Sequence, residues 1–181
     1  MTQTARTIAE ILALAADNTS QRISPLDLRD VIATLQVKFG GLLVVDGDEA
    51  ATVITNTTDY FDLAGTFTLS TPAEQFDQSA GNGLLTYTGQ PDIAAVLMGQ
   101  TSLIAASATQ TCEVRLEKNG ADVVRTAAES IVLSTGAVNA ALLGITSLSN
   151  GDTVNLAVRN TTDSVNVTAN EAHFLAIGIA T

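Results

Sequence analysis

The sequence predicts a mainly β protein, built as a two-layer sandwich that is preceded by a short α-helical N-terminal arm. From about residue 84 onward, apolar and polar residues alternate in segments that turn signals separate at roughly 8–12-residue intervals. The first 40 residues instead place their apolar side chains at helical spacing. We therefore divide the chain into an arm, residues 1–41, and a β domain, residues 42–181.

Two short helices are predicted in the arm. The first begins at Thr7 and Glu10, which fit a capping box. The second begins at Ser24, a favourable N-cap that a proline follows, and ends at a hinge formed by Gly40-Gly41. Helices this short cannot bury their apolar stripes alone, so we expect them to pack on each other, on copies of themselves or on a host surface. The residues predicted for docking of the arm or for arm–arm packing are Leu28, Val31, Ile32 and Leu35.

Several strands are predicted in the β domain. Leu84–Tyr87 forms a short one, and residues 93–106 and 130–143 are longer runs of small and β-branched side chains. Residues 111–118 and 153–159 alternate between one apolar and one polar side, which is typical of a strand with one solvated face. The apolar side consists of Cys112, Val114, Leu116, Val154, Leu156 and Val158.

The last predicted strand, 174–179, has no polar face. Its odd-numbered positions, which include Leu175 and Ile177, are as apolar as its even-numbered ones. In a two-layer sandwich one side of such a strand must be covered by another subunit or domain. We therefore expect a subunit interface at Phe174, Ala176 and Ile177.

Composition excludes several classes of protein. The formal charge is −11, with 8 basic and 19 acidic residues, whereas nucleic-acid binding requires clustered lysine and arginine. No apolar run approaches the roughly 20 residues that a membrane-spanning helix needs. The chain has one cysteine and therefore no internal disulfide. Because its start reads as an amphipathic helix rather than a secretory signal, we expect synthesis in a reducing cytoplasm.

Candidate catalytic and metal-binding residues are few. His173 is the sole histidine, and no Gly-x-Ser-x-Gly sequence accompanies it, so we expect a strand-end or surface side chain there. Cys112 alternates inward and is expected to be a buried, inert thiol. Residues 46–49 could offer oxygens to calcium but lack the spacing of an EF-hand loop, so a turn is expected. We predict no catalytic, cofactor or metal site, although three copies of His173 on a symmetry axis could bind a metal.

Three phrases of the sequence carry a family resemblance. In order they are Cys112–Gly120, Leu148–Val158 and Phe174–Ile179, and the first and second contain Asn-Gly turns. Together they resemble the late strands of the trimeric jelly-roll family that includes tumour-necrosis-factor-like and complement globular-head domains. The resemblance implies a TNF-like jelly roll and a homotrimer, because in that family the final strand lies near the three-fold axis.

A second resemblance concerns the arm. Ile23–Val31 is similar to a segment of tailed-bacteriophage virion proteins, in which a helical arm precedes a trimeric β head. The combination implies a phage structural protein, a trimeric decoration or cement protein on the capsid surface. Its implied partners are two further copies of itself and the major capsid protein or another virion protein.

Two alternative functions remain at this point. A short tail or head fibre would bind a host-surface glycan, but the sequence offers few aromatic residues for stacking on sugars. A hydrolase acting on cell-envelope polysaccharide would need two opposed carboxylates, and none stands in a recognisable motif. We therefore expect a structural protein rather than an enzyme.

Overall fold

A computed structural model describes residues 10, 31, 37–44, 49–70, 73–79, 83–123, 126–134 and 137–180. The predicted arm lies almost entirely outside these residues. Of it, the structure describes Glu10 and Val31, each with helical backbone, and residues 37–41. The docking residues Leu28, Ile32 and Leu35 fall outside the described residues, so the helical arm stays a prediction.

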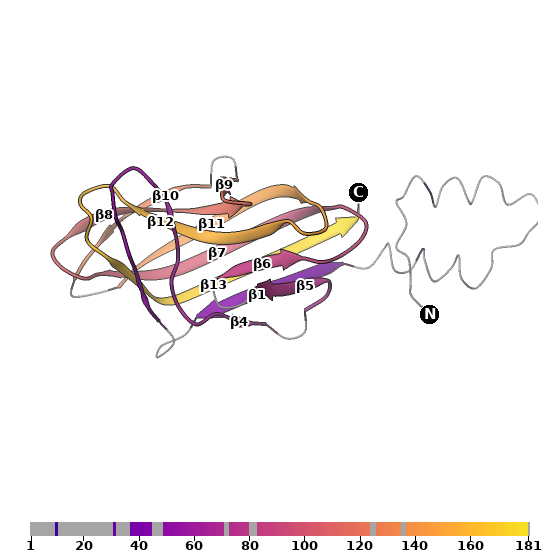
Figure 1. Ribbon diagram of the computed structural model, residues 1–181, viewed down its shortest axis with the longest axis horizontal. Helices are drawn as coiled ribbons and strands as arrows, with labels where there is room; N and C mark the ends of the chain where they lie inside the picture. The colour runs from indigo at the N-terminus through magenta and orange to yellow at the C-terminus, as the bar shows by residue number, and fades with distance from the viewer. Residues whose placement is uncertain are drawn as a thin grey trace, which may run out of the picture.

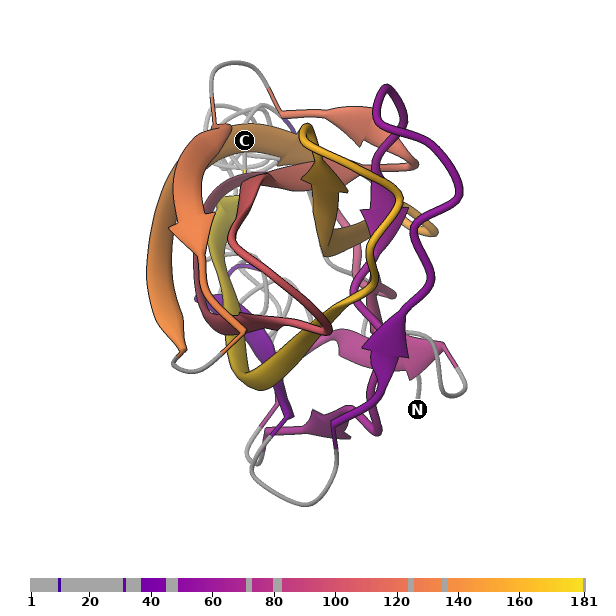
Figure 2. The same ribbon diagram turned by 90° about the vertical axis from the view of Figure 1, so that its left-hand side faces the viewer.

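The described part is a sandwich of two antiparallel sheets (Figures 1 and 2). In the first sheet the strands run in the order β11-β7-β13-β1-β4, and β2 pairs with β13. Their bounds are Lys38–Val44 (β1), Ala51–Thr52 (β2), Thr68–Leu69 (β4), Ile93–Ala105 (β7), Val138–Leu148 (β11) and Val167–Ala180 (β13). The long strands β7 and β13 lie in the interior of this sheet, and the long strand β11 forms one of its edges.

The second sheet has the order β10-β8-β12-β6-β5, with β3 beside β12 and β9 beside β8. Its strands are Phe61–Asp62 (β3), Phe76–Ser79 (β5), Leu84–Tyr87 (β6), Gln110–Lys118 (β8), Ala121–Asp122 (β9), Ala128–Val132 (β10) and Thr153–Asn160 (β12). From β6 to β13 the chain crosses repeatedly between the two sheets. This connectivity is that of a jelly roll, and the predicted mainly β sandwich is confirmed.

The core lies between the sheets, and alternation along the strands decides which side chains enter it. Cys112, Val114 and Leu116 of β8 are fully buried, as are Val154 and Val158 of β12. Their partners in the first sheet include Ile93, Leu97 and Leu103 of β7. The inward sides predicted for residues 111–118 and 153–159 are therefore confirmed.

Both predicted Asn-Gly turns are present. Asn119 and Gly120 have φ values of 52° and 73° and join β8 to β9, and Gly151 has a φ of 91° between β11 and β12. Asparagine and glycine tolerate these left-handed conformations better than other residues. The run 130–143, in contrast, divides into the end of β10 and the start of β11, which lie in different sheets.

The predicted hinge at Gly40-Gly41 is wrong, because both glycines lie inside β1 and pair with Ala176 and Leu175. A Cβ at Gly40 would lie 2.4 Å from the Cβ of Phe76. The glycines therefore permit close approach of strands rather than bending of the chain. The β domain begins by Lys38, ahead of the predicted boundary at residue 42.

Strand β1 also fixes where the arm leaves the sandwich. Lys38 pairs with Gly178, so the start of β1 lies beside the end of β13 (Figure 1). At the opposite end, the β7–β8 and β12–β13 connections lie together, tied by a hydrogen bond from Ala106 N to Asn166 O of 3.0 Å. The start of β1 and the end of β13 thus share one end of the sandwich.

Candidate functional site

The outward side of the first sheet carries a group of apolar side chains. We call it the apolar face and define it by its residues on three strands: Val96 and Met98 on β7, Leu143 and Ile145 on β11, and Leu175, Ile177 and Ile179 on β13. Because side chains alternate along a strand, these positions point away from the core that their neighbours fill.

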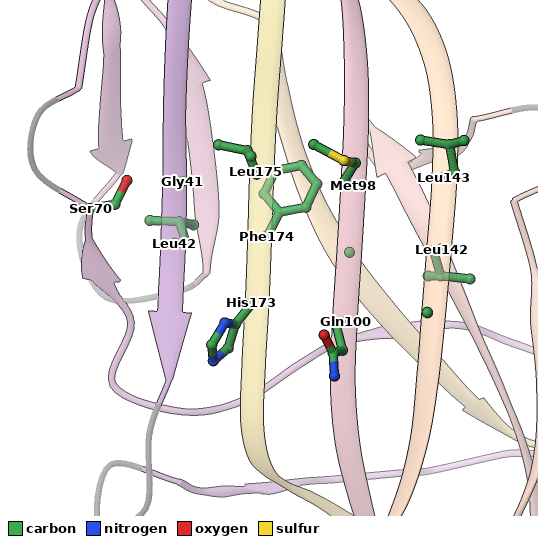
Figure 3. A pocket seen from close by; sticks show the side chains of 12 residues that line it. Gly41, Leu42, Ser70, Met98, Gln100, Leu142, Leu143, His173, Phe174 and Leu175 are labelled. Atoms are coloured by element: carbon green, nitrogen blue, oxygen red, sulfur yellow. The ribbon is translucent and has the colours of Figure 1, made fainter.

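Strand register arranges these residues in rows. Ile177 pairs with Val96, and Val96 pairs with Ile145, so one row crosses β13, β7 and β11. A second row is formed by the register of Leu175 with Met98 and of Met98 with Leu143 (Figure 3). Directly paired residues on one side of a sheet are in contact distance, so the rows form one continuous apolar surface.

Much of this surface remains open to solvent in the single chain. Ile145 is 73 % exposed, Leu143 64 % and Ile179 59 %. Isolated exposed apolar residues are common, but a contiguous patch across three strands marks an interaction surface in soluble proteins.

Charge is nearly absent from this side of the sheet. Among the outward positions described on β11, β7, β13 and β1, Glu171 is the one acidic residue, and none is a lysine or an arginine. It lies toward one end, where it pairs with Ser102, and the row of His173 and Gln100 separates it from the apolar face. The other acidic residues that the structure describes after position 41 lie elsewhere on the β domain.

A shallow groove of about 590 Å³ crosses the middle of this side (Figure 3). Met98, Leu143 and Leu175 line it, together with the polar side chains of Ser70, Gln100 and His173. Gly41 contributes no side chain, and a Cβ there would lie 2.7 Å from the carbonyl oxygen of Phe174. The groove is therefore a hollow in the sheet surface, mostly apolar, with a polar end.

The interface predicted from the sequence needs a correction. Phe174 is 4 % exposed and Ala176 is fully buried, and both point into the chain's own core against the second sheet. Neither is available to contact another copy. Ile177 alone of the three faces outward, together with Leu175 and Ile179. The sequence-based prediction did not include four residues of the apolar face, although each lies in an apolar run of the kind that forms strands. They are Val96, Met98, Leu143 and Ile145.

The outward side of the second sheet is different, because charged side chains cover it. Arg159 pairs with Glu113 at 2.5 Å, and the Tyr60 hydroxyl donates a 2.5 Å hydrogen bond to the same carboxylate. The Arg115 guanidinium lies 3.6 Å from the centre of the Tyr60 ring and donates hydrogen bonds to Glu117. We call these five residues the ionic network.

The ionic network shifts the pKa values of its members. Burial, followed by the hydrogen bond to Glu113, raises the pKa of Tyr60 to about 12. The same hydrogen bond, with the arginine contacts, lowers the pKa of Glu113 despite its partial burial. The Tyr60 side chain therefore remains a neutral phenol among paired charges. Arg159 also donates a hydrogen bond to the carbonyl oxygen of Thr58, which attaches residues 58–60 to β8 and β12.

Other candidate residues from the sequence have clear places. Cys112 is fully buried as predicted, and burial raises its pKa to about 11. His173 is an exposed residue of β13 at the polar end of the groove. Residues 46–48 lie outside the described part of the chain.

Within the described residues, no three histidine, cysteine or acidic side chains converge to hold a metal ion. No helix in that part of the chain is long and apolar enough to cross a membrane.

Comparison with known proteins gives likeness of fold only. No protein-family model matches the chain, and no curated protein sequence matches it. Murine APRIL at pH 5.0 is similar in structure, with a TM-score of 0.47 and 12 % identity, over 78 % of this chain and 100 % of that one. The Eiger TNF from S. frugiperda gives a TM-score of 0.48 and 11 % identity, over 79 % of this chain and 94 % of that one. At this level of similarity, nothing about activity follows from either protein.

Proposed function

We propose that the chain is a homotrimeric structural protein of a phage virion, a decoration or cement protein that binds the capsid shell through its N-terminal arm. The observation that carries the assembly is the apolar face, a continuous surface across β13, β7 and β11 without a charged side chain. Burial of such a surface is the main driving force for association between subunits.

Copies of the same chain are the occupants that we propose for this face. The chain carries a net charge of −11, so two copies repel each other wherever their acidic surfaces meet. The apolar face is the region where this repulsion is weakest and apolar burial is greatest. The groove beside Met98 and Leu143 would receive side chains of the neighbouring copy.

Attachment to a capsid is proposed for the arm. Its predicted helices place Leu28, Ile32 and Leu35 on one apolar stripe, and its charges balance, since residues 1–40 contain four basic and four acidic residues. Three arms on one trimer would bind three neighbouring sites, which multiplies a weak single contact by effective concentration. The resemblance of Ile23–Val31 to phage virion proteins supports this assignment.

The test has two parts. Light scattering of the purified chain should give three times the 18.7 kDa mass of one chain. Capsid shells that lack the protein should then co-sediment with it, and Ile32→Asp should abolish co-sedimentation while leaving the mass unchanged. Asp77→Asn, an exposed change on β5, serves as the control that retains binding.

Either part can fail separately. A monomer at all concentrations would overturn the role of the apolar face. A trimer that binds a specific glycan on an array and no capsid shell would overturn the decoration role in favour of a fibre.

A further inference from the structure

A polar hollow adjoins the apolar face on the outward side of the first sheet. It begins at Gln100 and His173, the two polar side chains at the end of the apolar groove (Figure 3). Two recesses of about 40 and 570 Å³ form the hollow, and both are lined by Ser102, Asn139 and Glu171. The hollow lies beyond the rows of the apolar face, toward the end of the sandwich opposite the start of β1.

A β-bulge in β13 shapes the larger recess. The register with β7 shifts between Ala169 and Glu171, so Asn170 is an extra residue on this strand. Ala169 is fully buried, whereas Asn170 and Glu171 both line the recess. Thr101 fixes the bulge, because its Oγ1 donates a 3.2 Å hydrogen bond to the carbonyl oxygen of Glu171. Bulges re-aim side chains and are frequent next to functional sites, and this one turns two neighbouring polar side chains into the same hollow.

The amide and hydroxyl groups of the hollow are not used inside the chain. Gln100, Ser102, Asn139 and Asn170 make no side-chain hydrogen bond to another described residue. All other asparagines that the structure describes do hydrogen-bond through their side chains within the chain, and they are Asn56, Asn119, Asn150, Asn155, Asn160 and Asn166. The hollow therefore gathers donors and acceptors that remain available to a ligand.

The charge of the hollow and of the chain indicates which polar ligand fits. Glu171 is the one carboxylate in the hollow, and the chain carries a net charge of −11, so anionic ligands are repelled. Carboxamides and serine hydroxyls both donate and accept, which matches ligand hydroxyl groups, since these also do both. The volume of about 570 Å³ lies within the roughly 300–1,000 Å³ of small-molecule sites. The recess of about 40 Å³ has room for about two or three water molecules or one hydroxymethyl group.

We propose that this hollow binds a neutral oligosaccharide. Asn139, Asn170 and Gln100 hydrogen-bond its hydroxyl groups, and Glu171 accepts from two adjacent ones. All of these residues belong to one chain, so the site rests neither on the capsid attachment nor on the trimer proposed above. A trimer would carry three such sites, and their simultaneous engagement would strengthen binding to a surface that displays many copies of the saccharide.

The test is an array of neutral and acidic oligosaccharides, probed with the full chain at pH 7. At least one neutral oligosaccharide should be bound, and sialylated or uronate-containing ones should not. Isothermal titration calorimetry with the bound neutral oligosaccharide then compares variants. Ser102→Ala should weaken binding roughly 2- to 10-fold, and Glu171→Gln, which removes a charged acceptor, roughly 10- to 100-fold. Ser147→Ala is the matched control, because Ser147 is an exposed serine of β11 outside the hollow, and it should leave the affinity unchanged.

Several results would overturn the proposal. Binding of acidic oligosaccharides alone, or of none, would contradict the ligand class. Equal affinities of the native chain, Ser102→Ala and Glu171→Gln would show that the saccharide binds elsewhere. Light scattering and capsid co-sedimentation of Glu171→Gln should match those of the native chain, so a failure of this site stays distinct from a failure of the proposed function.

Discussion

Replacing Leu143 by aspartate tests the assembly most directly. Leu143 is 64 % exposed in the single chain, so the substitution leaves the core of each subunit intact. Full burial of a leucine side chain contributes about 1.5–3 kcal/mol, of which the exposed part corresponds to about 1–2 kcal/mol per copy. Three copies then lose about 3–6 kcal/mol, or roughly 10²- to 10⁴-fold in the association constant of the trimer.

Burying three unpaired carboxylates adds a further cost, so this figure is a lower bound. The assay is sedimentation equilibrium over a wide concentration range, with circular dichroism to confirm that the variant is folded. Leu133→Asp is the matched control, because Leu133 is a partly exposed leucine outside the apolar face. If Leu143→Asp and Leu133→Asp dissociate at the same concentration as the native chain, the apolar face is not the interface.

Three further outcomes follow from the structure. Tyr60→Phe removes the hydrogen bond to Glu113 and should lower the free energy of unfolding by about 1.5–3 kcal/mol in urea denaturation; an unchanged midpoint would mean that the bond contributes nothing. Gly40→Ala places a methyl group against Phe76 and should cost about 1–3 kcal/mol, so a Tm equal to the native one would contradict the close approach of β1. Cys112, buried and with its pKa raised to about 11, should resist a thiol reagent at pH 8 until denaturant is added, and rapid labelling of the native chain would refute its burial.

The sequence predicts the later strands well because they combine two local signals. Alternation in residues 111–118 and 153–159 identified the buried side correctly, and the Asn-Gly pairs at 119–120 and 150–151 marked the turns. Both signals depend on neighbouring residues alone, so no knowledge of the fold is needed to read them. Short strands such as β2 and β3, two residues each, have no such period and were not predicted.

The orientation of β13 could not be predicted, for a physical reason. A shift of one residue exchanges the two sides of a strand, and only a polar side shows which one faces solvent. Phe174 and Leu175 are both apolar, so the pattern contains no such mark, and two of the three predicted interface residues, Phe174 and Ala176, were placed on the wrong side. Register against β7 resolves the ambiguity, but register is a long-range property.

The ionic network and the hydrogen bond between Asn155 and Asp62 were outside the reach of sequence reasoning as well. Tyr60 and Glu113 are 53 residues apart in sequence, and Asp62 and Asn155 are 93 apart. No spacing rule connects such residues, because the second sheet brings together strands that are distant along the chain.

The pairing of Lys38 with Gly178 has a practical consequence for display. A peptide fused after the last strand would emerge beside the start of β1, at the end of the β domain from which the proposed arm would reach its support. Insertions in residues 106–109 or 161–164, the connections at the far end, would instead lie away from that end, and the proposed trimer would carry three copies of them. Exposed polar connections accept insertions better than strands do, so these two loops are the sites to choose for carrying an antigen or an affinity tag on a particle.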